Sequence, residues 1–119
     1  MLQNGKILKN ACVAKDIYEM LLEAPEIAKS SKPGQFVNLK LSEKLDPLLR
    51  RPISLHRIDA ENGTLSLLYL VVGKGTAMLS QMEEGEMLDV LGPLGNGWNC
   101  DFKGQHAVLV GGGIGIAPL

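Results

Sequence analysis

Four adjacent residues, Arg51, Pro52, Ile53 and Ser54, suit a phosphorylated ligand. They begin a β-prone segment in which Pro52 rigidifies the backbone and Ser54 lies on the same face as Pro52, because side chains of a strand alternate with a period of two. A guanidinium can bind a phosphate with two hydrogen bonds, while a hydroxyl and strand N–H groups can reach the edge of a heteroaromatic ring. The same residues also suit an exposed arginine beside an edge proline, so this motif alone leaves both interpretations open.

A glycine-rich turn between a strand and a short helix is the second motif. The apolar residues up to Val72 are followed by Gly73, Lys74, Gly75 and Thr76. Glycines let the backbone approach an anion, the start of a helix supplies partial positive charge, and the threonine hydroxyl adds a donor. The spacing differs from a Walker A loop, so nucleoside triphosphate hydrolysis has no support. A strand-to-helix turn can also need glycines for structural reasons alone.

Short apolar segments separated by Pro, Gly, Asn and Asp predict an all-β barrel or sandwich that would position these motifs. The Asn62-Gly63 pair predicts a hairpin between the fourth and fifth strands. Only one short helix is predicted, from Thr76 to Met82, with Thr76 as its N-terminal cap. The predicted strands are Lys6 to Lys15, Ile17 to Glu23, Gln35 to Leu41, Arg51 to Asp59, Thr64 to Val72 and Met87 to Leu91.

The C-terminal residues are uncharged from Ala107 onward, with an apolar run to Val110 and then a glycine cluster. This pattern predicts the first strand and the glycine-rich loop of an α/β nucleotide-binding unit, in which a following helix would help to bind phosphate. We therefore expect residues 1–103 to form a complete domain and residues 104–119 to be the start of a second, truncated one. Because an unpaired strand invites pairing, residues 107–119 are also expected to favour self-association.

Composition and charge argue against several functional classes. A net charge of −1 and 4% aromatic residues provide neither a basic groove nor a stacking surface for nucleic acid. No segment approaches the roughly 20 apolar residues of a membrane span, and no signal peptide is evident, so we expect a cytoplasmic protein that binds no membrane. Cys12 and Cys100 predict two free thiols. His56 and His106 have no neighbouring ligand residues, so no metal site is expected.

Five motifs in a fixed order resemble the ferredoxin reductase superfamily, over essentially the whole chain. Within it, the sequence is most similar to the electron-transfer subunits of NAD-linked dihydroorotate dehydrogenases. The resemblance implies a six-stranded antiparallel Greek-key barrel that binds FAD, followed in the family by an NAD-binding domain and a [2Fe–2S] segment, neither site being expected in this chain. The five motifs are Pro33-Gly34-Gln35-Phe36, Arg51-Pro52-Ile53-Ser54, Gly73-Lys74-Gly75-Thr76, Gly92-Pro93-Leu94-Gly95 and Gly111 to Pro118.

The resemblance also implies a set of cofactor-binding residues and an activity. Electrons from dihydroorotate, oxidised in a catalytic partner subunit during pyrimidine biosynthesis, would pass through this FAD toward NAD. An aromatic residue is common in the superfamily where Ile53 stands, so ring stacking falls either to Tyr69 or to a residue outside this chain. The implied roles are contact with the flavin and its phosphates for Arg51, Pro52, Ile53 and Ser54, with the ribityl and ring region for Leu68, Tyr69 and Leu70, and with the pyrophosphate for Gly75 and Thr76.

Electron transfer through a flavin requires little chemistry from the protein, since the cofactor carries the reaction and the protein binds and tunes it. No catalytic side chain is therefore expected. Without the remainder of a nicotinamide-binding sheet, the chain alone is not expected to be a competent NADH reductase. The alternative function is a flavin-free interaction module that docks on a catalytic partner subunit through its apolar C-terminal residues.

Overall fold

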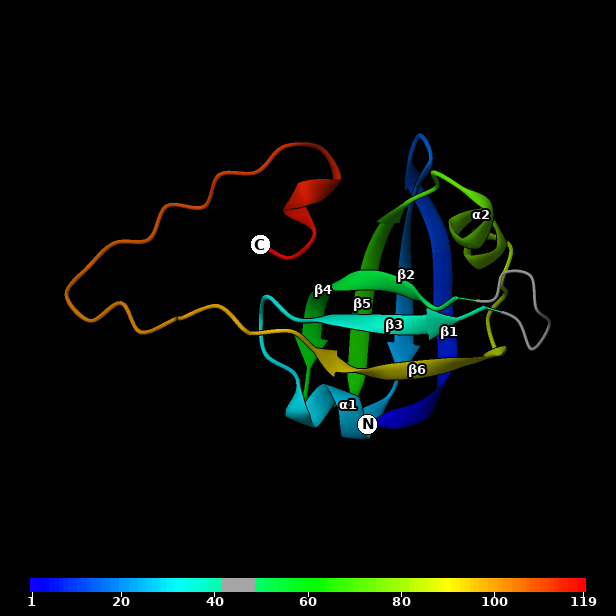
Figure 1. Cartoon of the computed structure of the whole chain (residues 1–119), viewed down its shortest axis with the longest axis horizontal. Helices are drawn as coiled ribbons and strands as arrows, with labels where there is room; N and C mark the ends of the chain where they lie inside the picture. The colour runs from blue at the N-terminus through cyan, green and yellow to red at the C-terminus, as the bar shows by residue number, and fades with distance from the viewer. Residues whose placement is uncertain (42–48) are drawn as a thin grey trace.

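The computed structural model describes residues 1–41 and 49–119, which form a closed six-stranded barrel (Figure 1). The strand order around the barrel is β1-β2-β5-β4-β3-β6, and all neighbouring strands are antiparallel. Because β2 lies beside β5, strands β2 to β5 make a Greek key. The predicted all-β Greek-key barrel is confirmed. Its strands are β1 (Leu2–Ala14), β2 (Ile17–Glu23), β3 (Phe36–Lys40), β4 (Arg51–Asp59), β5 (Thr64–Leu70) and β6 (Met87–Leu94).

The ends of the strands depend both on the local sequence and on which strands pair with each other. The predictions for β2 and β4 are confirmed to the residue, and the Asn62-Gly63 hairpin joins β4 to β5, with Gly63 at a φ of 68°. Strand β1 begins earlier than predicted, at Leu2, because its first residues pair with β6 from Leu91 to Met87. This pairing closes the barrel, which the predicted strands alone could not establish.

The core lies inside the barrel and follows the two-residue alternation of the strands. Tyr18 and Tyr69 face each other across β2 and β5, and their stacked rings have centroids 5.8 Å apart. Burial of these apolar side chains is the main stabilising contribution. The buried hydrophobic side chains of the strands are Ile7, Met20, Leu22, Val37, Leu39, Leu55, Leu65, Leu67, Tyr69, Leu88 and Val90.

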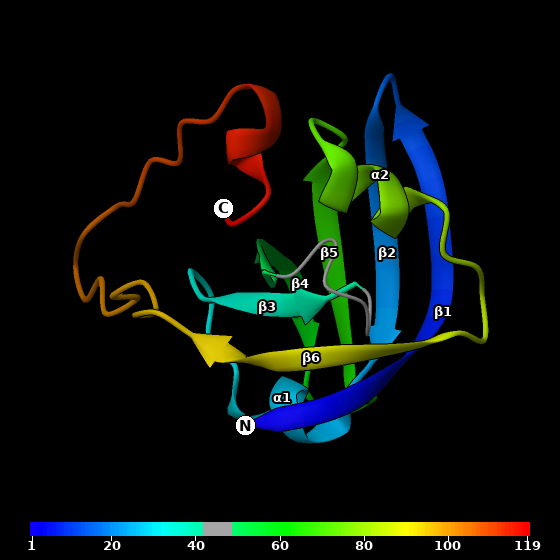
Figure 2. The same ribbon diagram turned by 45° about the vertical axis from the view of Figure 1, so that its right-hand side comes forward.

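A short helix that the sequence analysis missed, α1 (Pro25–Ser30), covers the end of the barrel near the N-terminus (Figure 2). Pro25 at its start, Glu26 in its first turn and Lys29 in its last turn are the signals that could have revealed it. Ile27 and Ala28 are fully buried. Six residues are too few to form a stable helix alone, so burial against the barrel must stabilise it.

The predicted helix is present as α2 (Lys74–Ser80), but its start was placed wrongly. Gly73 is the N-terminal cap, and Thr76 lies within the first turn. The Thr76 hydroxyl accepts hydrogen bonds from the backbone N–H groups of Val72 at 2.9 Å and Gly73 at 3.2 Å. It therefore satisfies donors that precede the helix, which corrects the prediction that Thr76 caps it.

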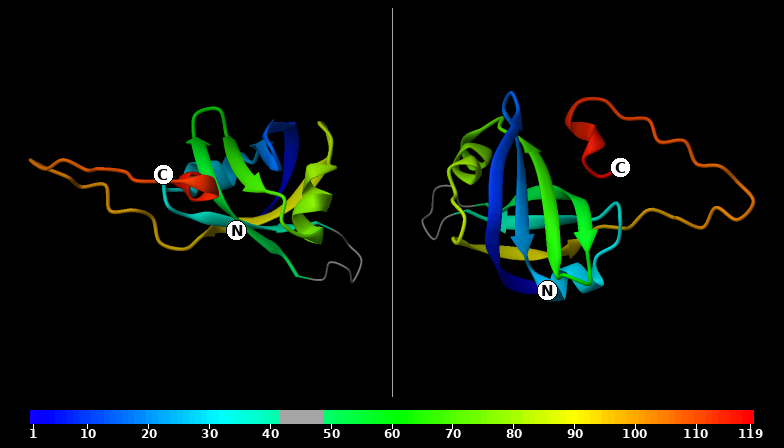
Figure 3. Two further views of the ribbon diagram at one scale, coloured as in Figure 1. Left: turned by 90° about the horizontal axis from the view of Figure 1, so that it is seen from above. Right: turned by 180° about the vertical axis from the view of Figure 1, so that it is seen from behind.

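Beyond β6, residues 95–112 form no helix or strand, and the chain follows a wide arc away from the barrel (Figure 3). The chain then returns as a 3₁₀ turn, η1 (Gly113–Ile116), which contacts β5. The predicted strand over residues 107–110 is not formed, because no strand pairs with it; Val108 and Val110 are 84% and 86% exposed.

Cys12 and Cys100 are free and exposed, as predicted. Among the described residues, no helix is long and apolar enough to span a membrane.

The Tyr69 hydroxyl gives the barrel a testable dependence on alkaline pH. Burial raises the pKa of Tyr69 to about 12. Since an unfolded tyrosine ionises near pH 10, folding stability is retained below pH 10 and lost as the pH rises from about 10 to 12. Urea unfolding at several pH values should show this loss, and a Tyr69→Phe variant should show a smaller one. Equal slopes in the two proteins would contradict the assignment.

Candidate functional site

A cleft of about 470 Å³ lies over β4, β5 and the start of α2. Eight of the nine predicted cofactor-binding residues line it, and the ninth, Gly75, is buried behind Arg51. The structure therefore brings two motifs that are distant in sequence to one site. The sequence analysis missed five lining residues, one before α2 and four near the C-terminus. The lining residues are Arg51, Pro52, Ile53, Ser54, Leu68, Tyr69, Leu70, Val72, Thr76, Ile114, Gly115, Ala117 and Pro118.

Arg51 packs directly on the first turn of α2. A Cβ added to Gly75 would collide with Arg51 Nε and lie 2.9 Å from Arg51 Cγ. The Arg51 Nη1 group also donates a hydrogen bond to the carbonyl of Leu49 at 3.0 Å. The guanidinium and the N-terminal turn of α2 thus form one end of the cleft, where both contribute positive charge.

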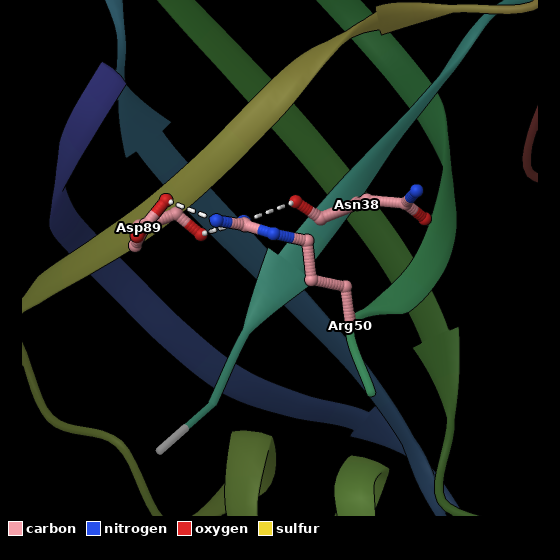
Figure 4. A network of polar contacts seen from close by, with 3 residues as sticks. All are labelled: Asn38, Arg50 and Asp89. Carbon is pink, nitrogen blue, oxygen red and sulfur yellow. Dashed lines mark hydrogen bonds and ion pairs between the residues drawn. The ribbon is translucent and has the colours of Figure 1, made fainter. Parts of the chain in front are cut away.

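The preceding residue, Arg50, has a different role (Figure 4). Its guanidinium forms an ion pair with Asp89 of β6 at 3.0 Å. It also donates to the carbonyl of Asn38 in β3 and to that of Asp89, both at 3.4 Å. Arg50 therefore links the chain just before β4 to two strands, and Asp89 balances its charge. Of the two consecutive arginines, only Arg51 lines the cleft.

Tyr69 supports the cleft from inside the barrel. Its side chain is 2% exposed, its ring stacks on Tyr18, and its hydroxyl donates a 2.8 Å hydrogen bond to Asn10 Oδ1. Asn10 Nδ2 donates in turn to the carbonyls of Leu79 and Met82, both at 2.9 Å. This network ties α2 to β1 and β5. Because the ring faces the core, the alternative that Tyr69 stacks on a flavin disagrees with its placement.

The remaining walls of the cleft are largely apolar, with Ile53 and Leu70 on the strands and Ile114 near the C-terminus. Pockets with apolar walls and a few placed polar groups suit small organic ligands. Here the arrangement suits a ligand with a flat apolar part and an anionic group. Within residues 1–41 and 49–119, no group of three or more His, Cys, Asp or Glu side chains could hold a metal.

Curated relatives match the chain along nearly its whole length. The dihydroorotate dehydrogenase B (NAD(+)) electron transfer subunit of Bacillus cereus (strain Q1) is 45% identical over 119 residues, which are 98% of this chain and 46% of that protein. The subunit of the same name from Desulforamulus reducens is 46% identical over 116 residues, 98% of this chain and 44% of that protein. The chain is homologous to part of these electron transfer subunits. It spans a little under half of their length.

A solved structure agrees with this relationship. An NADH-dependent reduced ferredoxin-NADP oxidoreductase, studied for flavin-based electron bifurcation, superposes with a TM-score of 0.73 at 34% identity. The superposition covers 80% of this chain and 34% of the other. This chain thus has the ferredoxin reductase-like barrel fold. No protein-family model matches the chain.

Because Arg51 packs on Gly75, we expect substitutions of these two residues to have coupled effects on the free energy of unfolding. Gly75→Ala should lower the free energy of unfolding by about 1–3 kcal/mol, because the added methyl displaces Arg51. Gly73→Ala is the matched control, since a Cβ there meets nothing within 4 Å. In an Arg51→Ala background the cost of Gly75→Ala should disappear, as a double-mutant cycle by urea unfolding would measure. An additive cycle would show that the two residues do not interact.

Proposed function

We propose that the cleft binds FAD. The proposal depends chiefly on one observation: the Arg51 side chain lies against Gly75 and near Thr76, at one end of a cleft whose other walls are apolar. Such a site offers charge to a pyrophosphate and apolar surface to a flavin ring. The homology to electron transfer subunits and the likeness to a reductase with flavin-based chemistry support this cofactor class.

The residues can be assigned different tasks toward the cofactor. The Thr76 hydroxyl already accepts from Val72 and Gly73, so its task is to hold the turn in shape. The groups that would hold the phosphates are the Arg51 guanidinium and the backbone N–H groups of Gly75 and Thr76 in the first turn of α2. Pro52, Ile53 and Ser54 would line the flavin, and Leu68, Tyr69 and Leu70 would support it from β5.

The wider activity is proposed from the names of the relatives. When bound, FAD supplies hydride and single-electron transfer. We propose that this chain is the flavin-binding part of an electron transfer subunit, which relays electrons from dihydroorotate, oxidised in a catalytic partner subunit, toward NAD in cytoplasmic pyrimidine biosynthesis. Residues 1–103 would form the FAD-binding domain, and residues 104–119 would begin an NAD-binding domain. The chain binds and orients the cofactor, and no proton transfer by a side chain is required.

Titration with FAD tests the cofactor assignment. The purified chain should show flavin absorbance or acquire it with added FAD, and Arg51→Ala should weaken binding by about 10- to 100-fold through loss of charge-assisted hydrogen bonds. Arg57→Ala, an exposed arginine of the same strand outside the cleft, is the matched control and should leave affinity within about twofold. Riboflavin lacks phosphate, so its binding should be insensitive to Arg51→Ala. Absence of FAD binding, or equal effects of the two variants, would contradict the proposal.

Three apolar residues of the C-terminal arc are exposed to solvent. The exposed fractions of Val108, Leu109 and Val110 are 84%, 68% and 86%, and such a surface favours association with another protein molecule. We propose that they promote self-association of this chain or docking on the catalytic partner, as in the flavin-free alternative. They pair with no strand among the residues that the structure describes, and unpaired extended backbone can pair between molecules.

Deletion of residues 107–119 should therefore lower self-association and leave the barrel folded. The six strands and their core lie entirely before residue 95, so their pairing does not depend on the deleted residues. Sedimentation velocity would measure the association state, and circular dichroism would report the barrel. Unfolding of the shortened protein would show that the C-terminal residues belong to the core, and unchanged association would refute the role of the apolar run.

A further inference from the structure

Strand β4 contains an irregularity at His56. Leu55 pairs with Leu67 of β5, whereas Arg57 pairs with Ser66, so His56 is an extra residue without a partner on β5. A β-bulge of this kind turns a side chain out of the ordinary alternation, and bulges often occur beside functional sites. The bulge gives His56 an orientation that a regular strand would not.

His56 uses this orientation to contact the C-terminal segment. Its Nδ1 lies 2.8 Å from the carbonyl oxygen of Ala117. Because a carbonyl can only accept a hydrogen bond, Nδ1 carries the hydrogen and donates it. Ala117 is 2% exposed, in contrast to the highly exposed residues of the arc that precedes it.

A second side chain holds the next carbonyl along the chain. The indole N–H of Trp98 donates to the carbonyl of Pro118 at 3.1 Å. Trp98 is itself fixed beside the barrel, since its backbone N–H donates to the carbonyl of Pro33 at 2.7 Å and its ring lies against Gly34. Two side chains from different parts of the molecule therefore bind two consecutive carbonyls.

These contacts determine one wall of the cleft. Ala117 and Pro118 line the cleft, together with Ile114 and Gly115 of the same segment. Residues 99–112, which lead from Trp98 to this segment, form no helix or strand, so no regular element links the segment to the barrel. Pro118 also lines a second cavity of about 320 Å³ beside His56 and Leu55, so its position decides where one cavity ends and the other begins.

We propose that His56 and Trp98 form a carbonyl clamp that positions residues 114–118 as the C-terminal wall of the cofactor cleft. The proposal rests on the proposed FAD site and deepens it. The sequence offered His56 only as an isolated histidine. Both are positioning residues, because they act on the ligand through the wall that they hold.

Hydrogen exchange tests the clamp without any ligand. His56→Ala should increase exchange of the amides of residues 113–119 by about tenfold, as expected for loss of one hydrogen bond. His56→Asn should restore most of the protection, since the asparagine amide places a donor near the position of Nδ1. Arg57→Ala is the control and should match the parent protein. Trp98 is the only tryptophan in the chain, so its emission should shift to the red in His56→Ala as the segment detaches.

The FAD affinity of the same variants connects the clamp to the site. His56→Ala and Trp98→Phe should each weaken FAD binding several-fold, and His56→Asn should bind nearly as the parent does. Unchanged exchange and emission in His56→Ala would overturn the clamp, and faster exchange with unchanged FAD affinity would overturn its positioning role. If the parent itself binds no FAD, the proposed function fails, whereas the exchange result still decides whether the clamp exists.

Discussion

Closure of the sheet is the constraint on which the site depends. Strand β6 pairs on one side with β1 and on the other with β3, so every strand has two neighbours and no edge remains open. Closure fixes the place of β4 beside β5 and brings the end of β5 and the start of α2 next to Arg51. The first and last strands in sequence therefore make the cleft possible, although neither lines it.

Within the closed barrel, contacts between pairs of groups fix the positions of the side chains that form the site. Arg50 is held by Asp89 and by carbonyls of β3 and β6, while the next side chain lies in the cleft. Gly75 leaves the space that Arg51 occupies, and Thr76 binds the backbone before the helix. The positive end of the cleft is thus organised by the protein itself, and a ligand would not have to assemble it.

The arrangement suits a protein whose chemistry is carried by a cofactor. The cleft contains a cationic end and apolar walls, and the described residues provide no cluster of metal-ligating side chains. One wall of the cleft comes from residues near the C-terminus. The chain leaves the barrel after β6, forms the wide arc, and comes back to lie beside β4 and β5. A flavin site made in this way would draw on residues separated by more than sixty positions in the sequence.

The sequence by itself determined the strand-and-turn pattern and the hairpin at Asn62-Gly63, because alternation and turn chemistry are local properties. Its resemblance to the ferredoxin reductase superfamily implied most of the residues that line the cleft. Tertiary structure alone decided the inward placement of the Tyr69 ring, the division of tasks between Arg50 and Arg51, and the helix α1, which is too short to form without its burial. It also decided the contact between His56 and Ala117. These features depend on strand register, a bulge and close packing between distant segments, and no local pattern encodes which segments will meet.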